Sequence, residues 1–66
     1  MKTTTRTERQ NALNRAIRQS KADGLTFVLI REDHIVVTPN ADEAKAYVHT
    51  RGYRVYAKCD GGYMVL

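Results

Sequence analysis

Two cations and two tyrosines near the end of the chain recur in a pattern that suits nucleic-acid binding. Arg54, Tyr56 and Lys58 occupy alternate positions, and Tyr63 follows them after an Asp-Gly-Gly turn. Alternate residues of a strand point to one face, so these four side chains are expected to share an exposed face of a sheet. On such a face, aromatic rings stack on bases and neighbouring cations contact phosphates, as in known single-strand binders.

Positive charge is concentrated in the first third of the chain. The formal net charge is +4, but residues 1–22 contain six Lys or Arg against one carboxylate, Glu8, whereas residues 23–66 have a net charge of −1. This asymmetry indicates an anionic partner. The expected phosphate contacts are Arg6, Arg9, Arg15 and Arg18. A basic helix that is simply solvated is the alternative.

Residue patterns typical of catalysis are missing from the sequence. It has no glycine-rich phosphate loop, no nucleophile elbow and no pair of carboxylates with an obvious pocket. His34, His49 and Cys59 are the only histidines and cysteine, and their positions do not follow a zinc-binding pattern. We therefore expect no enzyme, no cofactor and no metal site.

A helix should position the basic residues of the first third. Thr5 and Glu8 stand at capping-box spacing, with Thr7 and Gln10 as a second candidate, so a helix should start near residue 6. Gly24 is a typical stop. Four apolar side chains recur at helical spacing: Ala12, Leu13, Ala16 and Ile17. They predict one narrow apolar stripe that faces the core.

Two hairpins and a second helix should complete the domain. Residues 25–30 and 34–38 are rich in β-branched side chains and predict the first hairpin, which Pro39 ends. Asn40 caps a second helix that stops at Gly52. Two further strands over 53–59 and 62–66, joined at Asp60-Gly61, predict the second hairpin.

The predicted fold class is α+β. Two helix-hairpin units (αββαββ) should form a four-stranded, mostly antiparallel sheet with both helices on one face. A flexible tail over residues 1–5 should precede a single domain over 6–66, whose core is marginal at this size. The chain has neither an apolar run of about 18 residues nor a signal-peptide pattern, so we expect a cytoplasmic location and no membrane contact.

Both sides of the first hairpin are apolar, which leaves one side without cover if the helices lie on one face. The exposed side is expected to include Val28, Ile30 and, in one register, Val36. Exposed apolar patches of this kind usually mark interfaces, so a homodimer or a protein partner is expected there. The alternative, which needs no partner, is that another part of the chain covers this hairpin.

These patterns predict a small, non-catalytic binding protein that contacts nucleic acid through its basic first helix and its Tyr/Arg/Lys face. The rival hypothesis is a protein-binding inhibitor or adaptor that uses the same face, because Tyr and Arg are also favoured anchors of protein interfaces. One example would be a small phage-encoded antagonist of a bacterial defence complex. Such antagonists share the small size and basicity of this chain and its lack of catalytic motifs.

Overall fold

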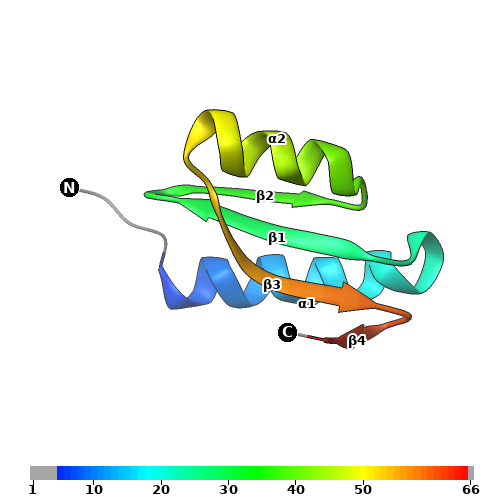
Figure 1. Cartoon of the computed structure of the whole chain (residues 1–66). Coiled ribbons are helices and arrows are strands. Elements are labelled where there is room, and N and C mark those ends of the chain that lie inside the picture. Colours follow the sequence, from blue (N-terminus) through cyan, green and yellow to red (C-terminus); the bar gives the residue numbers. More distant parts are fainter. Residues whose placement is uncertain (1–4, 66) are drawn as a thin grey trace.

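A computed structural model describes residues 5–65, which form two helices and a four-stranded antiparallel sheet (Figure 1). The elements follow the chain as α1 (Arg6–Asp23), β1 (Thr26–Arg31), β2 (His34–Thr38), α2 (Ala41–Arg51), β3 (Arg54–Asp60) and β4 (Tyr63–Met64). The α+β class is therefore confirmed. Of the tail expected over residues 1–5, only Thr5 lies within the described residues, and Leu66 of the expected last strand lies outside them.

Both helices begin at a residue whose side chain caps them, as the sequence predicts. The Thr5 hydroxyl accepts a hydrogen bond from the Glu8 amide, and the Glu8 carboxylate accepts one from the Thr5 amide, both at 3.1 Å. This capping box satisfies two amides at the helix start. The Asn40 side chain caps α2 by accepting from the Glu43 amide at 3.0 Å. The local signals therefore place both helix starts correctly.

The strands lie in the order β2-β1-β3-β4, with every neighbouring pair antiparallel. Central strand β1 is buried on both of its sides, because Val28, Leu29 and Ile30 are at most 5% exposed. Successive residues of a strand point to opposite faces, so both faces of the sheet must be covered at β1. The two helices provide this cover.

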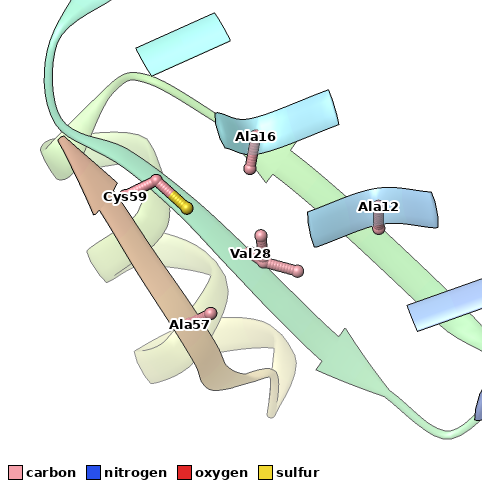
Figure 2. Packing of buried hydrophobic residues seen from close by; sticks show 5 residues of the cluster. All are labelled: Ala12, Ala16, Val28, Ala57 and Cys59. Atoms are coloured by element: carbon pink, nitrogen blue, oxygen red, sulfur yellow. The ribbon is translucent and has the colours of Figure 1, made fainter. Parts of the chain in front are cut away.

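The helices cover opposite faces of the sheet, and the prediction of one shared face is wrong (Figure 1). On one face, residues of α1, β1 and β3 form a single buried cluster: Ala12, Ala16, Val28, Ala57 and Cys59 (Figure 2). On the other face, Ala44 and Val48 of α2 line a groove with Phe27 of β1. The result is three layers, with the sheet in the middle.

Because the helices cover both faces, the exposed apolar patch predicted from the sequence is not found. Val28 and Ile30 are 0% and 5% exposed, and the side of β1 that carries them faces α1. Val36 is half-buried and pairs with Leu29, so it belongs to the opposite face. Val28 and Ile30 are therefore core residues rather than an exposed interface, and Val36 does not join them.

The second hairpin turns one residue later than expected. Asp60 pairs with Tyr63, so the turn residues are Gly61 and Gly62, with φ angles of 61° and 91°. Glycine adopts such angles without a steric penalty. The Gly62 amide also donates to the Ser20 hydroxyl of α1 at 2.9 Å. This turn is thus docked against the last part of α1.

Candidate nucleic-acid interface

The solvent-facing side of α1 combines basic and neutral polar residues. The helix buries Ala12, Ala16 and Ser20, which recur every four residues along one side. At about 100° per residue, the opposite side and its flanks carry seven exposed polar residues. These residues, which we call the outer face of α1, are Thr7, Gln10, Asn11, Asn14, Arg15, Arg18 and Lys21.

Carboxylates are absent from the whole middle of α1. Glu8 lies in the first turn and Asp23 is the last residue of the helix, and residues 9–22 contain neither Asp nor Glu. Arg15, Arg18 and Lys21 are exposed and lie within this stretch. Their positive charges therefore add along the helix and create a surface that attracts anions.

Small residues hold α1 close to the sheet and leave its outer face in the open. Ala12, Ala16 and Ser20 are at most 1% exposed, so the helix backbone lies near the strands. α1 contacts all four strands but not α2, which lies on the far side of the sheet. Within residues 5–65, α1 is therefore the only helix on its face and forms a ridge along it (Figure 1).

A second group of predicted residues lies on the same face as α1, near the start of β3. The Arg9 guanidinium carbon is 6.0 Å from the centre of the Tyr56 ring, which is a cation–π contact. Tyr56 is 42% exposed. Arg54 pairs with Ile30, whose side chain points to the α1 face, so the exposed Arg54 side chain belongs to this face too.

The four residues expected to share one open face are divided between two faces. Val28 pairs with Ala57 while Leu29 pairs with Val55, so a β-bulge leaves Tyr56 without a direct partner. A bulge adds one residue and reverses the alternation of side chains beyond it. Arg54 and Tyr56 consequently lie on the α1 face.

Lys58 and Tyr63 lie on the α2 face. Lys58 pairs with Phe27, which lines the groove beneath α2, and Tyr63 pairs with Asp60, two residues beyond Lys58. Tyr63 is 75% exposed. The Tyr/Arg/Lys strip therefore does not exist as one surface, and only Arg54 and Tyr56 extend the basic surface of α1.

A shallow apolar groove on the α2 face was missed by sequence reasoning. It has a volume of about 260 Å³ and is lined by Phe27, Ala41, Ala44, Lys45, Val48, His49 and Val55. The small side chains of Ala41 and Ala44 are among the α2 side chains that line it. Val55 of β3 is 39% exposed there. The small side chains of α2 were the sequence signal from which this groove could have been predicted.

Other sites considered from the sequence are not assembled in residues 5–65. No three His, Cys, Asp or Glu side chains of this part gather where they could hold a metal ion. Cys59 is buried beneath α1, and the loss of solvent raises the pKa of its thiol. His34 is exposed, with its Nδ1 atom 3.3 Å from an Asp33 carboxylate oxygen.

Neither helix in residues 5–65 is long and apolar enough to cross a membrane. No protein-family model matches the chain, and neither the curated proteins nor the solved structures match it at a significant level. Function is therefore inferred from the residues of the site.

Proposed function

We propose that this chain is a small, non-catalytic protein that binds nucleic acid through the outer face of α1. One observation carries the proposal: the exposed side of an 18-residue helix bears arginine, lysine, amide and hydroxyl groups, with no carboxylate between Glu8 and Asp23. Arginine and lysine supply the phosphate contacts that dominate nucleic-acid affinity. Amides and hydroxyls are the other side chains that contact phosphates and bases.

Phosphate contact is the main source of affinity in this proposal. Arg15, Arg18 and Lys21 are exposed in the C-terminal two-thirds of α1. Arg6 is exposed in its first turn, whereas the half-buried Arg9 lies over the Tyr56 ring. Each neutralised phosphate releases counterions, so the logarithm of affinity should fall by about 0.9 for each contact per tenfold rise in salt. A steep salt dependence is therefore the first signature of this surface.

Base stacking contributes less than the sequence suggested. The two tyrosines expected to act together, Tyr56 and Tyr63, lie on opposite faces of the sheet. Tyr56 alone remains beside the arginines, with Arg9 over its ring. A single half-exposed ring offers a place for one base at most, so the outer face of α1 rather than the sheet is the main binding surface.

The proposed location of the protein is the cytoplasm. Cys59 is a free thiol, and free thiols are typical of a reducing compartment.

The test is a binding titration with labelled DNA and RNA at 50 and 200 mM salt. The double variant Arg15→Gln, Lys21→Gln should lower affinity and reduce the salt slope by about 2. The matched control is Lys45→Gln, Lys58→Gln, which removes the same charge from the α2 face and should change neither quantity. No binding to any nucleic acid at 50 mM salt, or equal losses from both double variants, would reject the proposal.

The apolar groove supports a second candidate function, a protein-binding inhibitor or adaptor. Phe27, Val48 and Val55 offer apolar surface, and the exposed Tyr63 lies on the same face. A protein that docks there would bind with little salt dependence, because apolar burial rather than charge would supply its affinity. A host protein or a second copy of the chain could fill the groove. The variant Val55→Asp should abolish either complex, which light scattering would detect for a homodimer.

A further inference from the structure

We propose that the nucleic acid is double-stranded DNA and that α1 lies in its major groove with side chains that read bases. This inference rests on the proposed function and narrows it to one substrate. Asn11, Asn14 and Arg18 recur at intervals of three and four residues, so they lie in line on the outer face of α1. Arg15 and Lys21 are three residues before and after Arg18, about 60° to its two sides.

This layout matches the chemistry of a major groove. The amide of asparagine pairs with the N6 and N7 atoms of adenine, and the guanidinium of arginine pairs with the O6 and N7 atoms of guanine. Asn11, Asn14 and Arg18 would reach these base edges along the line of deepest insertion. Arg15, on one flank, would contact the phosphates of one strand. Lys21, on the other flank, packs its side-chain stem against Gly62, and its ammonium group would contact the phosphates of the other strand.

The asparagines contribute little to the fold. Asparagine is a poor helix former compared with alanine, yet Asn11 and Asn14 are exposed in the interior of α1. Within residues 5–65, Asn11 forms no side-chain hydrogen bond, and the Asn14 side chain only accepts one from Gln10 at 3.1 Å. Natural sequences depart from local preferences mainly at functional sites, so these residues point to a role in binding.

The position of α1 on the molecule favours duplex DNA over duplex RNA as the substrate. The major groove of B-form DNA is about 12 Å wide and accepts a helix, whereas that of duplex RNA is deep and too narrow for side chains to read. α1 is about 27 Å long and stands on its face of the sheet without a neighbouring helix in residues 5–65. Its ridge can therefore enter a groove without a clash from α2.

The first experiment compares three probes of matched length at one salt concentration: random-sequence duplex DNA, single-stranded DNA and duplex RNA. Duplex DNA should bind tightest, and selection from a pool of randomised duplexes should return a preferred sequence of adenines and guanines within one groove. If all three probes bind equally, or selection returns no preferred sequence, the inference fails while the proposed function stands. If no probe binds, both fail.

The second experiment assigns the reading residues. In the double variant Asn11→Ala, Asn14→Ala, preference for the selected duplex over a random one should fall by at least about tenfold, with binding to random DNA unchanged. Alanine favours the helix, so loss of fold is not expected, and circular dichroism checks this. As a control, Lys21→Gln should weaken binding to both duplexes equally. A sequence preference that survives the asparagine double variant would overturn the role of the outer face in reading bases.

Discussion

The two faces of the sheet are covered in different ways. On one face, the 18-residue α1 presses Ala12, Ala16 and Ser20 onto the strands, and all three are at most 1% exposed. On the other face, the 11-residue α2 has only Ala44 buried and leaves a groove over Phe27 of β1 and Val55 of β3. The α1 face therefore carries a continuous buried cluster, whereas the α2 face buries Leu29 and Ala44 but stays partly open at the groove.

On α1, the residues that stabilise the fold are therefore different from the residues proposed to bind. Small residues on its inner side fix the helix, so its outer side is free to carry charges and amides that the fold does not need. α2 has no such division, because the exposed Lys45 and His49 line the open groove together with the buried Ala44. Substitutions at matched positions on the two faces can test this view.

The largest expected effect is at Val28, compared with Val55 on the other face. Val28 is fully buried under α1, so Val28→Ala should lower the free energy of unfolding by about 2 kcal/mol, a large part of the stability of a chain this small. Val55 is 39% exposed, and Val55→Ala should cost well under 1 kcal/mol. Urea denaturation of the two variants measures both values. Equal losses would mean that the faces are packed alike.

A smaller effect is expected where α1 holds the turn between β3 and β4. Ser20→Ala removes the hydroxyl that accepts from the Gly62 amide, and should cost about 1 to 2 kcal/mol. Thr50→Ala is the control on α2, because the Thr50 hydroxyl only donates to the Ala46 carbonyl at an exposed site. Hydrogen exchange at the Gly62 amide should accelerate in Ser20→Ala alone. An unchanged exchange rate would show that this contact does not hold the turn.

The smallest effect distinguishes the two tyrosines that the bulge separates. Tyr56→Ala loses the cation–π contact with Arg9 and should cost about 0.5 to 1 kcal/mol. Tyr63 is 75% exposed, and Tyr63→Ala should change stability by less than about 0.5 kcal/mol. Only Tyr56→Ala should also weaken nucleic-acid binding. A stronger effect of Tyr63→Ala on binding would move the site to the α2 face.

Local sequence signals predicted the elements of the fold well. Helix starts are set by residues three apart in the chain, as at Thr5 and Glu8 or Asn40 and Glu43, and both caps are confirmed. The basic character of α1 was equally readable, because charge is a property of composition. These features depend on neighbours within one helical turn, so no long-range information is needed.

The arrangement of the faces could not be predicted because it depends on long-range pairing. The alternation of Arg54, Tyr56 and Lys58 predicted one face, but a bulge opposite Val28 and Leu29 breaks that alternation. No residue near Tyr56 announces the bulge. The apolar residues on both sides of β1 did indicate burial of both faces, and a second helix rather than a partner provides it.

The most direct test of nucleic-acid binding through α1 is an amide NMR titration of the whole chain with a short DNA duplex. We expect shift changes at Asn11, Asn14, Arg15 and Arg18, and at Arg54 near the start of β3, with none at Val48 in the groove. Changes confined to α2 and the groove residues, or no change at low salt, would contradict this expectation.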